Sequence, residues 1–196
     1  MEKIFKDGFK RVVAAALSVA VFTGFAGCDA FGVRKSMGVM NDRLINYNKA
    51  LNKLDYETVR SLTDWTGEDS DYTAIVDLFD TSYYGDSAGE GFVACSEYIA
   101  STISINYDIT AAEIYRDQAT LEFEYEMVDW QDVYHDPHGS YDEVLEDLKN
   151  CPDKITIDSV IIFEKVDEEA DWRLCKISDL GEVMSFVHTL PVIDND

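Results

Sequence analysis

The densest local group of metal-ligating side chains is the segment His135-Asp136-Pro137-His138. Imidazole and carboxylate groups are ligands for divalent transition metals. The two histidines flank a proline, however, and do not share one helix face as they do in the zinc motif His-Glu-x-x-His. An exposed polar loop is the simpler interpretation. We therefore predict no metal site and keep His135, Asp136 and His138 only as weak candidates.

Acid–base catalysis requires a histidine or a carboxylate inside an apolar pocket, where burial tunes its pKa. Besides the two histidines of that segment the chain has His188, which falls on the polar edge of the last helical pattern. In the strand expected at residues 103–107, alternation points Tyr107 inward, and Asp108 falls on the opposite face. Asp108 is therefore not expected to enter a pocket. We predict no catalytic residue and no bound cofactor.

The apolar segment Val12–Cys28 follows a short basic region and ends on a cysteine, a residue that can be lipidated. A basic region, an apolar region and small residues in this order are typical of a secretory signal. The apolar run of about 14 residues is shorter than the ~20 residues that span a bilayer. Its end, Phe25-Ala26-Gly27-Cys28, resembles the lipobox of bacterial lipoproteins, with Phe25 where leucine is usual.

The lipobox resemblance implies that residues 1–27 are removed and that Cys28 is acylated and becomes the N-terminus. Several acyl chains on one cysteine anchor a protein stably, because each buried methylene contributes about 0.8 kcal/mol. The implied location is the extracytoplasmic face of the cell membrane, with the domain held there by lipid. The alternative is an ordinary secretory signal that ends on a cysteine by chance.

The part of the chain after the signal is long enough for one domain. Removing 27 of the 196 residues leaves 169, and 46% of the chain is hydrophobic, so a full core is expected. The formal charge is −23, and the removed part carries four basic and two acidic side chains, so the remainder carries −25. This charge disfavours nucleic acid and anionic lipid surfaces as partners. It favours cations, basic partners or simply a solvated acidic surface.

Three further cysteines give no disulfide framework. Because the count is odd, at least one of the three, Cys95, Cys151 and Cys175, is unpaired. A predicted hairpin places Cys175 opposite Ile162 and far from Cys151. We expect free, partly buried thiols.

Helical periodicity dominates the first part of the domain. Ser36 is the expected N-cap of a helix whose apolar stripe runs from Met37 to Leu54, and Asp55 is the expected N-cap of a short second helix. Further short helices are expected over residues 72–79 and 92–100, with polar loops at 64–71 and 81–91.

Alternation dominates the second part. Glu122, Glu124 and Glu126 alternate with apolar residues, which predicts a strand with one solvated face. A row of carboxylates also suggests a metal or catalytic face, but a wet outer face that discourages edge pairing is far more common. The expected strands are 103–107, 111–116, 119–130, 155–166 and 172–177, with turns at 117–118 and 167–171. A loop at 131–139, a helix with the capping box Ser140–Glu143 and a terminal helix over 180–187 complete the domain.

Helices followed by an antiparallel sheet of long hairpins define an α+β class. Two segments, Ala50–Leu62 and 161–177, resemble the nuclear transport factor 2-like, or cystatin-like, superfamily, and in particular its secreted bacterial lipoproteins. The resemblance implies N-terminal helices packed on a curved, cone-like sheet. The expected organisation is a lipoprotein signal peptide at 1–27, the lipidated cysteine and a short linker at 28–35, one domain at 36–190 and a tail at 191–196.

Fold alone does not decide function. We expect a non-enzymatic, membrane-tethered domain that binds a small ligand or an envelope protein. Because some members of the superfamily carry catalytic side chains in their pocket, the alternative is a small isomerase, dehydratase or hydrolase. A third interpretation is a self-associating module, since related cones form dimers sheet to sheet.

Overall fold

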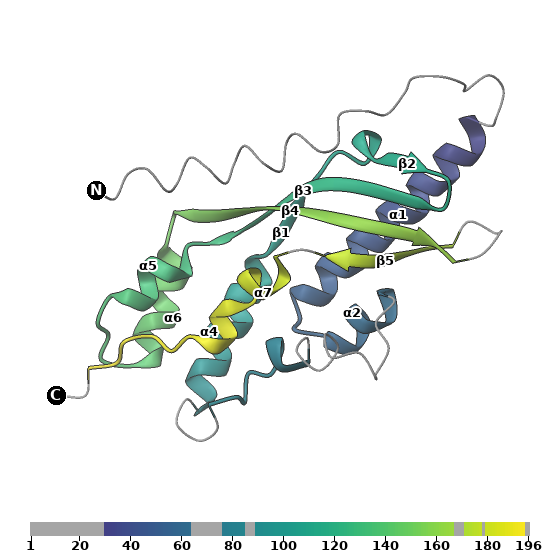
Figure 1. Cartoon of the computed structure of the whole chain (residues 1–196). Coiled ribbons are helices and arrows are strands. Elements are labelled where there is room, and N and C mark those ends of the chain that lie inside the picture. The colour runs from purple at the N-terminus through teal and green to yellow at the C-terminus, as the bar shows by residue number, and fades with distance from the viewer. Residues whose placement is uncertain (1–29, 64–75, 85–88, 167–170, 178, 195–196) are drawn as a thin grey trace, which may run out of the picture. The chain divides into compact units, whose positions relative to one another are not determined.

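A computed structural model describes residues 30–63, 76–84, 89–166, 171–177 and 179–194 (Figure 1). The chain divides into two units, Met1–Gly32 and Val33–Asp196. The expected signal peptide, Cys28, the loop at 64–71 and most of the turn at 167–171 lie outside the described residues. Within the described ranges, no helix is both long enough and apolar enough to cross a bilayer.

The described part is an α+β structure built on an open antiparallel sheet, as the sequence predicts (Figure 1). The helices are α1 (Ala30–Leu51), α2 (Tyr56–Leu62), α4 (Gly89–Thr102), α5 (Trp130–His135), α6 (Tyr141–Asn150) and α7 (Leu180–Val183), with 3-10 turns η2 (Ile109–Ala111) and η3 (Ser185–His188). The strands are β1 (Ser104–Asn106), β2 (Glu113–Tyr115), β3 (Gln118–Val128), β4 (Lys154–Lys165) and β5 (Trp172–Ile177).

The sheet has the order β1-β3-β4-β5, and β2 pairs with β3 on the side that β1 also uses. The alternation expected along β3 is confirmed. Its apolar residues are buried on what we call the core face, while Glu122, Glu124 and Glu126 point to the opposite, outer face. The core lies between the core face and the helices, and its largest fully buried side chains include Trp172, Tyr47, Tyr125, Phe92, Phe163 and Phe186.

Helix α1 begins earlier than the sequence pattern predicts. Ser36 lies inside the helix, which starts at Ala30, so the N-cap assigned to Ser36 is wrong. Serine caps a helix only where the preceding residues leave the helical conformation, and residues 30–35 contain no proline that would force them to. At the other end, Leu54 lies outside the helix in a left-handed conformation (φ 53°). The cap assigned to Asp55 is confirmed, because its carboxylate accepts a hydrogen bond from the Thr58 amide.

The segment expected as a loop at 131–139 contains helix α5. Asp129 caps this helix by accepting a bond from the Asp132 amide at 3.3 Å, and Trp130, Val133 and Tyr134 face the core. Trp130, which we expected to end β3, thus begins α5. The capping box of α6 is present in a modified form, since Glu143 accepts from the Gly139 amide (2.7 Å) rather than from the amide of the N-cap residue.

Two hairpin details differ from the prediction. The β2–β3 turn consists of Arg116 and Asp117, because Tyr115 pairs directly with Gln118. An irregularity in the β4–β5 pairing places Lys176 opposite Ile162, so the position predicted for Cys175 is wrong by one residue. An extra residue in one strand shifts the partners of every residue that follows it.

The C-terminal end is more ordered than a helix followed by a tail. The expected terminal helix is divided into α7 and η3. Beyond it, residues 191–194 run beside 134–138 and pair through an isolated parallel bridge between His138 and Ile193. We call residues 191–194 the C-terminal strap.

Candidate functional site

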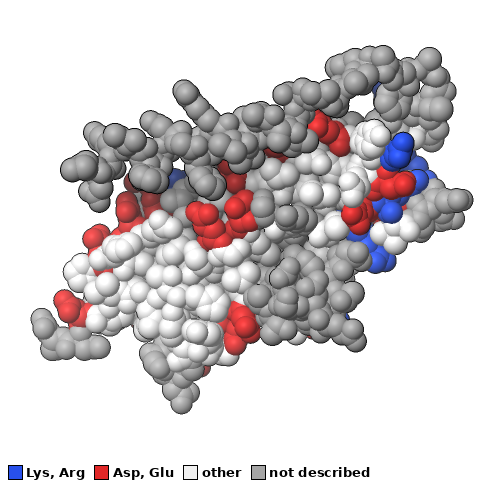
Figure 2. All heavy atoms as spheres, in the orientation of Figure 1, with Lys and Arg blue, Asp and Glu red and all other residues white. Residues whose placement is uncertain are grey.

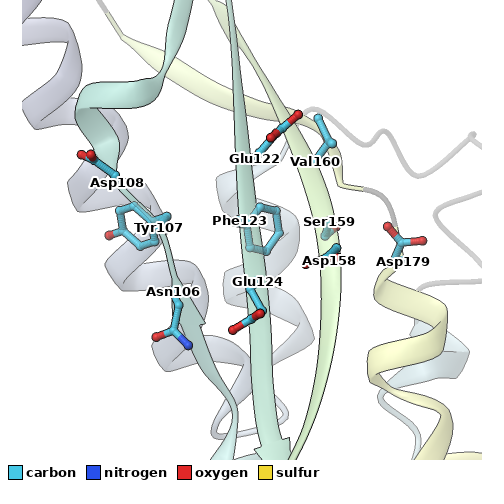
Figure 3. Close-up of a pocket in the computed structure, with 10 residues that line it drawn as sticks. All are labelled: Asn106, Tyr107, Asp108, Glu122, Phe123, Glu124, Asp158, Ser159, Val160 and Asp179. Carbon is cyan, nitrogen blue, oxygen red and sulfur yellow. The ribbon is translucent and has the colours of Figure 1, made fainter. Parts of the chain in front are cut away.

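A hollow of about 640 Å³ lies on the outer face of the sheet (Figure 3). Strand register creates it. Asn106 of β1 pairs with Glu124 of β3, and Glu124 pairs in turn with Asp158 of β4, which places the three side chains in one row across the sheet. We call this site the outer-face hollow; its lining is Asn106, Tyr107, Asp108, Glu122, Phe123, Glu124, Asp158, Ser159, Val160 and Asp179.

The hollow is strongly acidic. Glu122 and Glu124 extend from β3, Asp158 from β4, and Asp179 stands at the start of α7 (Figure 3). Within the described part of the chain, no basic side chain forms an ion pair with Glu122, Glu124 or Asp158, whereas Glu126 nearby is paired with Lys154 at 2.5 Å. Figure 2 shows carboxylates spread over this face of the molecule, whereas the basic side chains that it shows gather mainly at the right-hand end, where carboxylates also lie.

Two lining carboxylates owe their position to local backbone structure. Asp108 is the N-cap of η2 and accepts from the Thr110 hydroxyl and amide, which lowers the pKa of Asp108 and keeps it ionised. Asp179 has a left-handed backbone (φ 63°), a conformation that aspartate tolerates better than most residues, and its side chain does not cap α7. Both therefore add negative charge at the rim.

The chemistry available in the hollow is attraction of positive charge. Among the residues that the structure describes, no lysine, arginine or histidine lines it. Like charges directly opposite each other destabilise a sheet, so a bound cation lowers the repulsion between Glu124 and Asp158. No set of three or more histidine, cysteine or acidic side chains in the described ranges is arranged to hold a metal ion. The hollow is therefore better suited to several basic side chains, each attracted to a different carboxylate, than to a single metal ion.

A second, smaller groove of about 170 Å³ lies between α1 and β1. We call it the helix–strand groove; its lining is Leu44, Ile45, Asn48, Lys49, Ile105 and Tyr107. The inward orientation predicted for Tyr107 is confirmed, because its hydroxyl donates to Asn41 Oδ1 on α1 at 3.0 Å. Burial and the nearby Asp42 raise the pKa of Tyr107.

The three weak metal candidates are not brought together. His138 is 5% exposed, and its Nε2 lies 3.1 Å from Asp147 Oδ2 on α6. His135 is exposed at the end of α5, and its Nδ1 lies 2.6 Å from the Gln131 carbonyl oxygen. Asp136 is exposed. Each histidine thus has its own local partner, and neither lines the hollow or the groove.

His188, expected at a polar edge, is half-buried in η3. Its Nε2 lies 2.8 Å from the Asp77 carbonyl oxygen, and its ring packs edge-on against Tyr83. These contacts give the imidazole a structural role between η3 and the segment at 76–84.

Residues 85–89 contain a serine motif that the sequence analysis missed. Gly85-Asp86-Ser87-Ala88-Gly89 matches the pattern Gly-x-Ser-x-Gly. A nucleophile elbow requires a strand before the serine. Residues 81–84 form a turn instead, and residues 85–88 lie outside the described structure. The described residues that precede the motif therefore do not form the strand that a nucleophile elbow needs.

One thiol and three tyrosine hydroxyls, which could in principle react, are buried in the core. Burial raises the pKa of the Cys95 thiol to about 11, which leaves almost no thiolate at neutral pH. Burial likewise raises the pKa values of Tyr47, Tyr125 and Tyr134. These tyrosines therefore stay neutral and belong to the core.

Sequence reasoning found the row of glutamates but missed Asp158 and Asp179. The expectation that Asp108 lies outside any pocket is wrong: it falls on the face opposite Tyr107, as predicted, but that face carries the hollow, which Asp108 lines. Asp158 alternates with Ile157 and Ser159, so its outward direction was readable from the sequence. Its position beside Glu124 depends on the register of two strands far apart in sequence.

No protein-family model matches the chain, and no curated protein or solved structure is significantly similar to it. Its function is therefore inferred from its own residues.

Proposed function

We propose that this protein is a lipid-anchored, extracytoplasmic bacterial lipoprotein whose domain binds a positively charged partner. The anchor rests on one sequence observation: a basic region, a short apolar region and small residues end on Cys28. The packing of α1 on the core face of an antiparallel sheet supports a cone-like fold of the nuclear transport factor 2-like type as part of this proposal.

The binding role rests on the outer-face hollow. Glu122, Glu124 and Asp158 lie close together, and none of them forms an ion pair with a basic side chain of the described residues. Other surface carboxylates do form such pairs, as Asp171 does with Arg43 and Glu126 with Lys154. The volume of about 640 Å³ is large enough for a small molecule, but such sites are mostly apolar. Five of the ten described residues that line the hollow carry carboxylates, which favours a basic protein surface as the partner.

Metabolic labelling tests the anchor. The full chain and a Cys28→Ser variant are expressed in a bacterium supplied with an alkyne fatty acid, and membrane fractions are probed for the label. We expect label on the parent chain, none on Cys28→Ser, and full label on the control Cys151→Ser. Equal labelling of the parent and the Cys28→Ser chain rules out the lipid anchor at this residue.

Charge-matched variants test the binding role. The first variant combines Glu122→Gln, Glu124→Gln and Asp158→Asn; the control combines Glu90→Gln, Asp142→Asn and Glu146→Gln, which are exposed on α4 and α6. Titration calorimetry with a lysine-rich peptide measures the dissociation constant of each full-length chain. We expect about tenfold weaker binding for the first variant, equal to about 1.4 kcal/mol, and little change for the control. Equal weakening of both shows that net charge alone acts, and the assignment to the hollow is then wrong.

A further inference from the structure

Strand β1 is the edge of the sheet next to the acidic hollow. Ser104, Ile105 and Asn106 pair with β3 on one side. On the other side, no backbone hydrogen bond to these three residues is present in the part of the chain that the structure describes. An exposed edge presents a row of unpaired N–H and C=O groups that can pair with an incoming strand.

Helix α1 runs alongside this edge in the opposite direction. Asn52 Nδ2 donates to the Ile103 carbonyl at 3.1 Å near the start of β1, and Tyr107 donates to Asn41 near its end. The helix–strand groove lies between these two contacts. Figure 3 shows this geometry, with the purple helix beside the strand that carries Asn106. Helix α1 and β1 thus form the two sides of the groove, and an exposed sheet edge is a place where an extended peptide can add as a further strand.

The groove has the size and polarity for the side chain of such a peptide. Ile45 on its rim is 40% exposed, and the half-buried Ile105 supplies further apolar surface. Its volume of about 170 Å³ is smaller than the ~300 Å³ at which small-molecule sites begin. A peptide that adds to β1 would place every second side chain over this groove.

The remaining side chains of an added strand face the outer side of the sheet. There Asn106 stands next to Glu124, and Asp108 follows β1 directly. Asp42 lies on the helix side, close enough to Tyr107 to raise the pKa of Tyr107. Lys49 is the one basic side chain among the described residues that line the groove. The carboxylates on both sides of the edge favour basic residues in the incoming strand.

We propose that β1 and the helix–strand groove bind an extended segment of a partner protein in which apolar and basic residues alternate. The segment pairs with the backbone of Ser104–Asn106, inserts an apolar side chain between Ile45 and Ile105, and directs its basic side chains toward Glu124. This inference rests on the proposed binding of a positively charged partner and names the form of that partner. A second copy of this chain is a poor occupant, because its net charge of −23 repels the same acidic edge.

The probe is a synthetic octapeptide that alternates valine and lysine, and its counterpart alternates valine and glutamate. The full-length chain, purified in detergent, is titrated with each. We expect the lysine peptide to bind saturably and to slow amide hydrogen exchange at Ser104–Asn106. Ile45→Glu on the groove rim is expected to weaken binding about tenfold. Val33→Glu, on the same helix and 39% exposed, serves as the matched control and is expected to bind like the parent.

Three outcomes overturn this inference: equal affinity of the parent and the Ile45→Glu chain, no slower exchange in β1 when the lysine peptide is bound, or protection of β1 at high protein concentration without peptide. The last result assigns the edge to a second copy. A different result is that the triple variant of Glu122, Glu124 and Asp158 still binds the lysine-rich peptide more weakly than the parent while amide exchange in β1 is not slowed. In that case the proposed function stands, and only the addition of the peptide to β1 as a strand is wrong.

Discussion

The hydroxyl oxygens of Tyr47 on α1 and Tyr125 on β3 lie 2.8 Å apart, and neither side chain is exposed. The bond joins the long N-terminal helix to a central strand of the sheet inside the core. A buried hydroxyl without a partner is unfavourable. Each tyrosine therefore satisfies the other, and the pair fixes how α1 sits on the core face.

A double-mutant cycle on this pair is expected to show strong coupling. Tyr47→Phe or Tyr125→Phe alone leaves one buried hydroxyl unsatisfied, which lowers the free energy of unfolding by about 1–3 kcal/mol. The double variant removes both hydroxyls, so its loss is expected to be smaller than the sum of the single losses. Urea unfolding of the four chains measures the coupling. Additive losses would show that the two hydroxyls do not interact.

Alkaline pH is expected to destabilise the fold through the same pair. Burial raises the pKa of both phenols above the ordinary value of 10, so the folded state keeps protons that the unfolded state releases. Their contribution to stability is therefore complete below pH 10 and is lost as the pH rises further. Urea midpoints between pH 8 and 11 measure the loss. The Tyr47→Phe/Tyr125→Phe chain is expected to show a shallower decline, and parallel profiles would contradict this account.

Local patterns in the sequence were sufficient for much of the fold. The alternation along β3 and the cap at Asp55 act within a few residues, and the structure confirms both. Helix α5 was missed because six residues are too few to display a helical period. Its signal was nevertheless present, since Asp129 precedes Trp130 and Val133 with the spacing of a capped first turn. The irregular pairing at Ile162 has no local signature, because it depends on contacts between two strands.

The candidate surfaces were less predictable than the fold. The glutamates of β3 were identified as a solvated face, but the hollow exists only because Asp158 and Asp179 join them from other elements. The helix–strand groove depends on how α1 packs beside β1. Ile45 and Ile105 are 60 residues apart in sequence, so no spacing rule connects them.

Gly38 of α1 and Gly91 of α4 are expected to respond in opposite directions to substitution by alanine. A Cβ at Gly91 would lie 2.5 Å from the Cβ of Tyr141 on α6, so Gly91→Ala must push the two helices apart, at a loss of about 1–3 kcal/mol. A Cβ at Gly38 meets no atom of the described residues within 4 Å, and Gly38→Ala is expected to stabilise α1 by about 0.5–1 kcal/mol. Urea midpoints compare both with the parent. Equal effects of the two substitutions would contradict the close contact between α4 and α6.

Alkylation is expected to distinguish Cys95 from Cys151. Cys95 is fully buried and its pKa is raised to about 11, whereas Cys151 is half-buried. At pH 8 the raised pKa alone reduces the thiolate fraction of Cys95 about a hundredfold, and burial slows the reagent further. Iodoacetamide followed by peptide mass mapping is expected to label Cys151 first, and Cys95 only when urea is added. Early labelling of Cys95 in the native protein would show that α4 opens readily.

Removal of the C-terminal strap is expected to destabilise the domain. The Val192 amide donates to the Tyr134 carbonyl, the His138 amide donates to the Val192 carbonyl, and the Asp194 amide donates to the His138 carbonyl, at 3.1, 3.0 and 2.8 Å. Pro191 is buried beside them. The loss of three backbone bonds and of the cover over the buried His138 predicts a decrease of about 2–4 kcal/mol in the free energy of unfolding when residues 191–196 are deleted.

A chain that lacks only residues 195–196 is the matched control for this deletion and is expected to change by less than about 0.5 kcal/mol. Urea unfolding compares the two shortened chains with the parent. If both unfold at the same urea concentration as the parent, the segment is the plain tail that the sequence predicts. If only the longer deletion lowers the midpoint, the strap belongs to the folded domain. In that case the decrease in the free energy of unfolding measures how much residues 191–194 stabilise the packing of α5 and the loop at His138 on α6.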